Sequence, residues 1–105
     1  MAEAHLHRLR VRNYSPRTIE NHASYLRLFV EWAAEQKITK PADVTIFVLE
    51  DYQSHLYEVV KSDGNRLSPN AQQARLIPLR AYFSFMTKRR YIDANPAADL
   101  ELPKL

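Results

Sequence analysis

There is only one glycine, Gly64, among the 105 residues of this chain. Sheets need hairpins, and two-residue hairpin loops usually require Gly or Asn at positive φ. Gly64-Asn65 is the one candidate for such a loop, so the sequence argues against an all-β fold. With 46% hydrophobic and 26% charged residues, the composition is that of a globular chain. We therefore expect an all-α fold, and the length suits one domain with one core.

Four helices are predicted from the spacing of apolar residues and from the residues that begin helices. Ser15-Pro16 and Ser68-Pro69 each offer a hydroxyl N-cap followed by proline at the first helical position, where its missing N–H is harmless. Thr45 can cap a further helix. The predicted helices cover roughly residues 2–12, 15–36, 45–60 and 68–90, and we expect them to form a compact bundle.

Two stretches complicate this assignment. Residues 44–48 are β-branched and aromatic enough for a strand, but apolar spacing of three and four favours a helix there. Pro78 removes one backbone hydrogen bond inside the last helix, so we expect a kink. The apolar stripes that predict the core are Leu6, Leu9, Ile19, His22, Ala23, Tyr25, Leu26, Phe29, Trp32, Ala33, Ile46, Leu49, Tyr52, Leu56, Val59, Ala71, Ala74, Leu79, Tyr82, Phe83, Phe85 and Met86.

Charge is segregated along the chain, although the net charge is only +3. Residues 64–92 hold six cations and no acid, and residues 4–19 hold four arginines and no acid. Residues 31–63 are the reverse, with seven acids and three lysines. Two basic segments separated by an acidic one suggest a molecule with one positive side and a polyanion as partner. Two solvated helix surfaces are the ordinary alternative.

The chain offers little for metal or covalent chemistry. It has no cysteine, which excludes disulfides and thiolate chemistry. The four histidines lack metal-binding spacing, and Gly64 stands alone where a phosphate-binding loop needs several glycines. Glu50 and Asp51 are neighbours, and neighbours in a helix point about 100° apart. We expect no catalytic residue, metal site or cofactor here. No apolar run approaches the roughly 20 residues that span a bilayer, so we also expect a cytoplasmic protein without membrane contact.

The side chains best suited to a partner lie on the polar faces of the second and fourth predicted helices. Asn and Gln can pair with adenine, and Arg with guanine, in a major groove wide enough for a helix. Hydroxyls, an arginine and free N–H groups at a helix N-terminus suit phosphate oxygens. The candidate DNA-binding residues are Ser15, Arg17, Thr18 and Asn21 on the second helix, and Asn70, Gln73, Ile77 and Arg80 on the fourth. Plain capping and an ordinary solvated face are the alternatives.

The order of these segments resembles a known family. The run Tyr14-Ser15-Pro16-Arg17-Thr18-Ile19, followed by Tyr25, Leu28, Phe29 and Trp32, is similar to the start of the core-binding domain of tyrosine recombinases, the phage-integrase family. Residues 67–71 and 75–85 resemble the last long helix of that domain. Residues 95–97 and 101–104 resemble its exit into the catalytic domain. The resemblance covers essentially the whole chain.

The resemblance implies a SAM-like helical domain at residues 1–96 that clamps duplex DNA, and at residues 97–105 the start of a linker to a catalytic domain. It implies double-stranded DNA, that catalytic domain and other recombinase protomers as partners, in a bacterial or phage protein. It adds Ala74 and Arg75 to the candidate residues, although their spacing puts both nearer the apolar arc. Arg75 can reach a phosphate only by extending from the edge of that arc.

Strand cleavage by a tyrosine, the family's reaction, is implied for the catalytic domain only. Three of the six tyrosines here lie on core stripes, and we expect Tyr14, Tyr57 and Tyr91 to lack a surrounding cluster of Arg and His. Two other functions stay open. A helix-turn-helix regulator would share the basic recognition helix, and a helical protein-protein interaction module would use the basic face against an acidic partner.

Overall fold

The structure, a computed structural model, describes residues 2–105. Its elements are α1 (Glu3–Val11), α2 (Pro16–Glu35), the short 3-10 helix η1 (Pro41–Asp43), α3 (Ile46–Glu58) and α4 (Pro69–Lys88). Within residues 2–105 there is no strand beyond an isolated bridge between Val60 and Arg66, so the predicted all-α fold is confirmed. The strand alternative at 44–48 is wrong because Ile46 begins α3, and η1 lies between the second and third predicted helices, where no helix was predicted.

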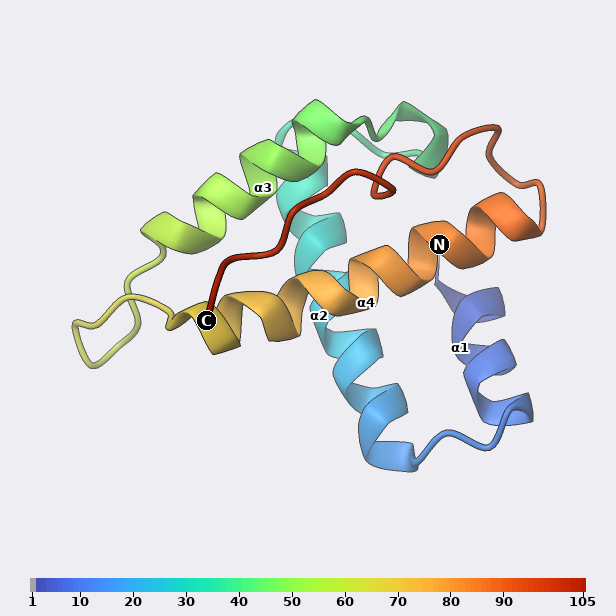
Figure 1. Ribbon diagram of the computed structural model, residues 1–105, viewed down its shortest axis with the longest axis horizontal. Coiled ribbons are helices and arrows are strands. Elements are labelled where there is room, and N and C mark those ends of the chain that lie inside the picture. The colour runs from blue at the N-terminus through green and yellow to red at the C-terminus, as the bar shows by residue number, and fades with distance from the viewer. Residues whose placement is uncertain (1) are drawn as a thin grey trace.

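α4 is the central helix: α1 and α2 form one group packed against it, and α3 forms the other (Figure 1). α4 crosses α2, and α1 packs against both of them near the C-terminal half of α4. α3 packs against α4, and the C-terminal segment lies between these two helices. Two side-chain amides fasten that segment: Gln53 of α3 donates to the Glu101 carbonyl at 2.9 Å, and Gln73 of α4 donates to the Pro103 carbonyl at 2.7 Å.

All three predicted N-caps are confirmed. The side-chain oxygens of Ser15, Thr45 and Ser68 accept the backbone N–H three residues later at 3.1, 3.2 and 3.1 Å. Each bond satisfies one of the backbone donors that a helix start leaves without a partner inside the helix. The prolines that follow Ser15 and Ser68 take the first helical positions, as the Ser-Pro pairs predict.

Three helices end with a residue in the left-handed conformation, and none of these residues is glycine. Asn13 follows α1 with φ 63°, Lys37 follows α2 with φ 65°, and Arg90 follows α4 with φ 62°. In each case the next backbone N–H donates to the carbonyl five positions back, at 2.9 or 3.0 Å, which is the Schellman ending. One glycine is therefore enough for this fold, because other residues occupy the helix ends where glycine is usual.

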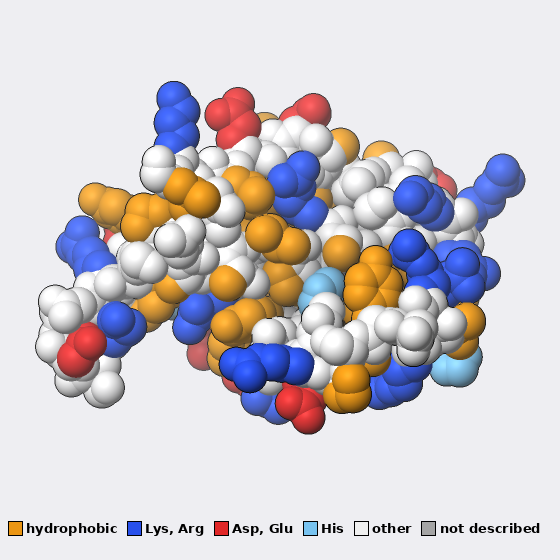
Figure 2. Space-filling model, turned by 60° about the horizontal axis from the view of Figure 1, so that its bottom comes forward, with side chains coloured by type: hydrophobic (Ala, Val, Ile, Leu, Met, Phe, Trp, Pro, Cys, Tyr) orange, Lys and Arg blue, Asp and Glu red, His pale blue; other side chains and the backbone are white. Residues whose placement is uncertain are grey.

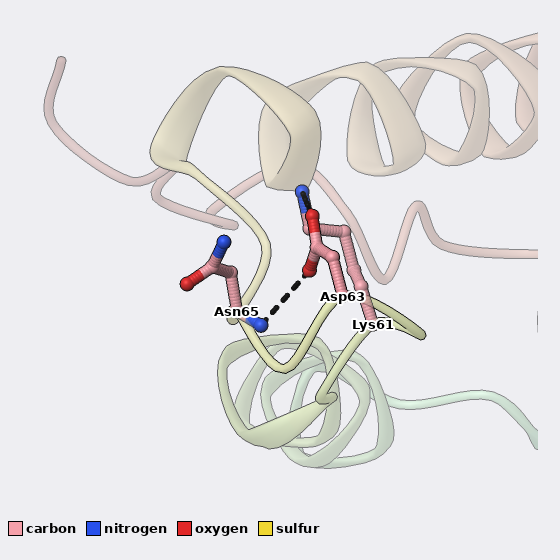
Figure 3. Close-up of polar contacts among 3 residues, drawn as sticks. All are labelled: Lys61, Asp63 and Asn65. Atoms are coloured by element: carbon pink, nitrogen blue, oxygen red, sulfur yellow. Dashed lines mark hydrogen bonds and ion pairs between the residues drawn. The ribbon is translucent and has the colours of Figure 1, made fainter.

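The single glycine lies in the loop between α3 and α4, at φ 85° (Figure 3). Asp63 accepts the Asn65 backbone N–H at 2.9 Å, and the Lys61 ammonium lies 3.6 Å from the Asp63 carboxylate. The Gly64 N–H donates to the Lys61 carbonyl at 2.9 Å. These contacts form a compact turn, as the sequence predicts, and the Asn65 hydrogen bond lowers the pKa of Asp63.

The core is centred on Phe29, whose side chain is 2% exposed. Its ring meets Tyr52 of α3 edge-on, with centroids 5.0 Å apart, and Phe83 of α4 edge-on at 6.2 Å. Such edge-to-face pairs are favoured by the ring quadrupoles. The buried apolar cluster consists of Leu26, Phe29, Ala33, Val44, Leu49, Tyr52, Leu56, Leu67, Leu76, Leu79, Tyr82, Phe83, Ile92, Ala97 and Leu100.

The predicted core face of α4 was partly wrong. Ala74 was expected inside but is exposed, whereas Leu76 and Pro78 are buried. The buried face is centred on Leu76, Leu79 and Phe83, and at about 100° per residue Ala74 lies on the opposite side of the helix from Leu76. α4 continues as one helix through Pro78, and the expected kink stays a prediction.

On the other helices, the predicted apolar stripes lie on the buried side, although some of their residues are only half-buried. Trp32, Tyr25 and His22 of α2 are half-buried rather than fully enclosed. Ala97 and Leu100 belong to the core cluster although they follow the predicted domain boundary at 96, and that boundary stays a prediction. Over residues 2–105, no helix combines the length and the apolar character needed to cross a bilayer.

Replacing Lys37 with glycine is expected to stabilise the domain, because glycine takes positive φ without the steric cost of about 1–2 kcal/mol that other residues incur. Glycine's greater loss of entropy on folding offsets part of that gain, which leaves about 0.5–1 kcal/mol. The melting temperature should then rise by roughly 2–8 °C in a domain of this size. Thermal unfolding followed by circular dichroism measures this. Lys37→Ala is the control, since it removes the same charge but keeps the Cβ, and equal melting of the two variants would contradict the argument.

Candidate nucleic-acid interface

The start of α2 presents the first group of predicted site residues. Ser15, Arg17 and Asn21 are exposed and Thr18 is half-buried. The Ser15 hydroxyl donates to the Thr18 hydroxyl at 2.9 Å besides accepting the Thr18 backbone N–H, so the capping role of Ser15 is real. Arg17 and Asn21 make no side-chain hydrogen bond or ion pair with residues 2–105. The helix start therefore keeps one cation and one amide free for a ligand.

The second group lies along α4 as an exposed strip, which we define as Asn70, Ala74, Ile77 and Arg80. Ten residues of helix separate its ends, a length of about 15 Å. Ile77 is 47% exposed, which is unusual for an isoleucine in the middle of a helix that is otherwise well packed. Ala74 is exposed in this strip although the spacing of apolar residues put it nearer the core, and its contact with DNA stays a prediction.

Gln73 lies at the edge of this strip and is only half-buried, but it already has a partner. Its amide nitrogen donates to the Pro103 carbonyl at 2.7 Å. A glutamine amide carries a second N–H and an acceptor oxygen, which are the two groups that pair with adenine. Base recognition by Gln73 therefore stays a prediction that this contact does not oppose.

Arg75 points away from the strip, toward the packed side of α4. Its guanidinium donates to the Ala71 carbonyl at 3.2 Å and lies 5.2 Å from the centre of the Tyr25 ring of α2. It also approaches Tyr52: burial raises the pKa of that phenol to about 12, and the Arg75 charge opposes the rise. These contacts agree with the spacing of apolar residues, which puts Arg75 nearer the apolar side of the helix. Contact of Arg75 with a phosphate stays a prediction.

Most of the cations in the described chain are not neutralised by acids. The ion pairs within residues 2–105 are Arg27 with Glu31 at 4.0 Å and Lys61 with Asp63 at 3.6 Å, and both pairs are exposed. Figure 2 shows blue Lys and Arg side chains spread over the face that carries α1 and the start of α2, with red ones mainly near its edge. Four guanidiniums lie instead over aromatic rings at 5.2–5.6 Å, namely Arg12, Arg66, Arg75 and Arg89. A ring orients a guanidinium without cancelling its charge.

A cavity of about 370 Å³ lies where α1, α2 and α4 meet, and the sequence analysis did not find it. Its lining combines two histidines, four cations and a tyrosine: His5, Arg8, Arg12, Tyr14, His22, Lys88 and Arg89, together with Leu9, Ala81, Ser84 and Phe85. We call it the α1 cavity. The expectation that Tyr14 lacks Arg and His neighbours is wrong, because folding brings residues of three helices beside it.

The two histidines of the α1 cavity touch each other. His5 Nε2 lies 3.4 Å from His22 Nδ1, which fits a hydrogen bond between two neutral rings. His5 is 3% exposed and packs edge-on against Tyr82, with ring centroids 5.7 Å apart. Burial, aided by the nearby His22, lowers the pKa of His5 to about 4, and burial also lowers the pKa of His22. Both rings are therefore neutral at pH 7, and the charge of the cavity comes from its Arg and Lys side chains.

This pairing also leaves one unsatisfied group. His5 Nδ1 is buried and has no hydrogen-bond partner among the described residues. No signal in the sequence alone could have paired His5 with His22, because they are seventeen positions apart on different helices. Residues 2–105 contain no group of three or more His, Cys, Asp or Glu side chains arranged to hold a metal ion.

The fold and the surface together define a small helical domain with a positive face suited to a polyanion. The chain belongs to the family of phage integrase N-terminal SAM-like domains, whose family model matches residues 1–93. The resemblance to tyrosine recombinases in the sequence analysis is therefore confirmed.

Three relatives of this chain are named tyrosine recombinases. "Tyrosine recombinase XerC 2" of Ralstonia nicotianae is 41% identical over 103 residues, which cover 98% of this chain and 30% of the relative. "Tyrosine recombinase XerC" of Xanthomonas axonopodis is 34% identical over 97 residues, covering 89% and 32%. The protein of that name from Oceanobacillus iheyensis is 26% identical over 93 residues, covering 89% and 28%. The chain thus spans about a third of the length of these relatives. No solved structure matches it.

The burial of His5 beside His22 predicts that acid destabilises the fold. The unfolded histidine has a pKa of 6.5 and folded His5 one of about 4, so the unfolded chain binds more protons between these values. The stability that the neutral His5 contributes is then fully present above pH 6.5 and is lost as the pH falls toward 4. Arg8, Arg12, Lys88 and Arg89 line the same cavity and further oppose a charged histidine. Melting temperatures between pH 7.5 and 4.5 measure the loss.

His5→Phe removes the titrating group and keeps an aromatic ring beside Tyr82. We expect this variant to lose less stability than the wild type on acidification. His7 is exposed on the same helix, so His7→Phe serves as the matched control and should keep the wild-type pH profile. If the melting temperature of His5→Phe fell with pH in parallel with that of the wild type, protonation of His5 would not be the cause of the acid sensitivity.

Proposed function

We propose that this chain is the DNA-binding domain of a site-specific tyrosine recombinase and that it clamps duplex DNA at the recombination site. The observation that carries the proposal is the strip on α4, which stays exposed while the face centred on Leu76, Leu79 and Phe83 is buried. The arginines of α1 and of the start of α2 have no ion-pair partner within residues 2–105 and add positive charge to the same molecule. The family membership supports the same conclusion independently.

In this proposal α4 reads the major groove and the start of α2 holds the backbone. Asn70 and Arg80 have the side chains that pair with adenine and guanine, and Ile77 can contact a thymine methyl group. Ser15, Arg17, Thr18 and Asn21 sit at a helix N-terminus, where backbone N–H groups and a partial positive charge favour phosphate oxygens. Binding by the domain alone rests mainly on charge.

We assign strand cleavage to another part of a longer polypeptide. The relatives named tyrosine recombinases are about three times as long as the segment matched here. Tyr52 and Tyr82 are buried, and burial raises the pKa of each to about 12, so neither is suited to attack a phosphate. The partners in the proposal are duplex DNA, the catalytic domain of the same polypeptide and further recombinase protomers on the DNA, in the cytoplasm of a bacterium.

Binding to a duplex is expected to weaken steeply with salt. Each phosphate that the domain neutralises adds about 0.9 to the slope of log affinity against log salt concentration. Contact of four to six cations with the backbone gives a slope magnitude of roughly 3–6. Fluorescence anisotropy with a labelled duplex at several salt concentrations measures it. Affinity that does not change with salt would contradict the proposal, and absence of duplex binding even at low salt would favour a protein partner.

Arg80→Ala is expected to weaken binding about tenfold or more, because a charge-assisted hydrogen bond contributes about 1.5–3 kcal/mol. The melting temperature should change little, since Arg80 is exposed and has no side-chain partner in the described chain. Arg27→Ala is the matched control: it removes the same charge from an exposed residue that already pairs with Glu31. Equal losses of affinity in both variants would mean that Arg80 acts only through net charge.

A further inference from the structure

The α1 cavity is a second concave, positively charged site that the proposed contacts on α2 and α4 do not use. Arg8 and Arg12 lie four residues apart and therefore on one face of α1. Lys88 and Arg89 approach from the end of α4. No Asp or Glu lines the cavity, and none of the four cations has an ion-pair partner within residues 2–105. Four like charges around one hollow repel each other unless an anion occupies it.

Two of these guanidiniums are held in place by aromatic rings. Arg12 lies 5.3 Å from the centre of the Tyr14 ring, and Arg89 lies 5.6 Å from that of Phe85. Both rings line the same cavity. A guanidinium that is oriented by a ring keeps its charge and its outer N–H donors for a ligand, and less freedom is lost when the ligand binds.

One local effect opposes an anion. α1 and α4 both end beside the cavity, and each helix end contributes about half a negative charge. Together these contributions are about one charge, against four positive side chains. The Schellman hydrogen bonds at Asn13 and Arg90 also occupy some of the terminal carbonyls. The cations therefore dominate, and the cavity favours an anion.

The α1 cavity adjoins the strip on α4. Ala81 and Ser84 line it and also line a second hollow, of about 460 Å³, that contains Ile77 and Arg80. Tyr14 precedes the cap of α2 directly, so the cavity also adjoins the predicted backbone contacts of that helix start. A polyanion that lies along Ile77 and Arg80 and reaches the start of α2 passes the mouth of the α1 cavity.

We propose that the α1 cavity binds a phosphate group of the backbone of duplex DNA, through Arg8, Arg12, Lys88 and Arg89. This inference rests on the proposed function, and it extends the DNA footprint from α2 and α4 onto α1. The shared chemistry is that of a phosphate anion, and DNA is its source in the proposal. The ring nitrogens of the half-buried His22 lie in the same wall as the cations, so the ring reports on the occupied site.

The test compares substitutions that each remove one positive charge, either inside or outside the α1 cavity. Arg8→Gln and Lys88→Gln each remove a charge from the cavity. Arg10→Gln removes the same charge from the same helix, but Arg10 is exposed and does not line the cavity. Anisotropy titrations of a labelled 30-base-pair duplex at four salt concentrations give the affinity and the salt slope of each variant. Circular dichroism confirms that each variant is folded.

We expect Arg8→Gln and Lys88→Gln to weaken binding about tenfold and to lower the salt slope by about 0.9 each, the value for one lost phosphate contact. Arg10→Gln should keep the wild-type slope. Equal slopes for Arg8→Gln and Arg10→Gln would overturn the inference. If Arg80→Ala weakens binding while the cavity variants do not, the inference fails and the proposed function stands. If the wild type binds no duplex, both fail.

A second measurement separates DNA from free phosphate as the source of the anion. The His22 ring signals in nuclear magnetic resonance spectra should shift when duplex DNA is added, in the wild type and in Arg10→Gln, and should shift less in Arg8→Gln. Inorganic phosphate should shift the same signals weakly and be displaced by duplex. A site that takes inorganic phosphate and that duplex cannot empty would overturn the assignment to DNA.

Discussion

The fold depends on the burial of Phe29 where α2 meets α3 and α4. Its ring contacts Tyr52 and Phe83 edge-on, so one side chain connects three helices that are distant in the sequence. Truncating such a ring typically costs about 3–5 kcal/mol, a large part of the stability of a small domain. The angle at which α2 crosses α4 follows from this packing, and with it the positions of the strip and of the helix start that the proposed DNA contacts use.

The helices and their starts could be predicted because they depend on neighbours in the sequence. Ser15, Thr45 and Ser68 cap helices through atoms three residues away, and apolar spacing marked the buried sides of α2 and α3. The buried side of α4 was harder to predict, because aromatic and small residues lie on several sides of this helix. The exposed Ala74 could therefore not be distinguished from a core residue. The contacts of His5 with His22 and of Gln73 with Pro103 depend on tertiary packing, and no local pattern reveals them.

The arrangement of charge explains how a chain with a net charge of only +3 can have a strongly positive side. α4 contains no acid and α1 contains only Glu3, whereas η1, α3 and the loop after α3 together hold Asp43, Glu50, Asp51, Glu58 and Asp63. The arginines contact aromatic rings more often than carboxylates, which keeps their positions defined and their charges active. Of these four rings, Tyr25 and Phe85 were predicted only as core residues, so their second role in orienting cations was not inferred from the sequence.

The C-terminal segment is attached to the same helix that carries the strip. Ala97 and Leu100 are buried in the core, and the Gln73 amide grips the Pro103 carbonyl one turn from Asn70. Because the segment is held in these ways, a displacement of the polypeptide near Leu105 is transmitted directly to α4. In the proposed function, this short segment therefore acts as a mechanical link between the proposed DNA contacts of α4 and the catalytic domain.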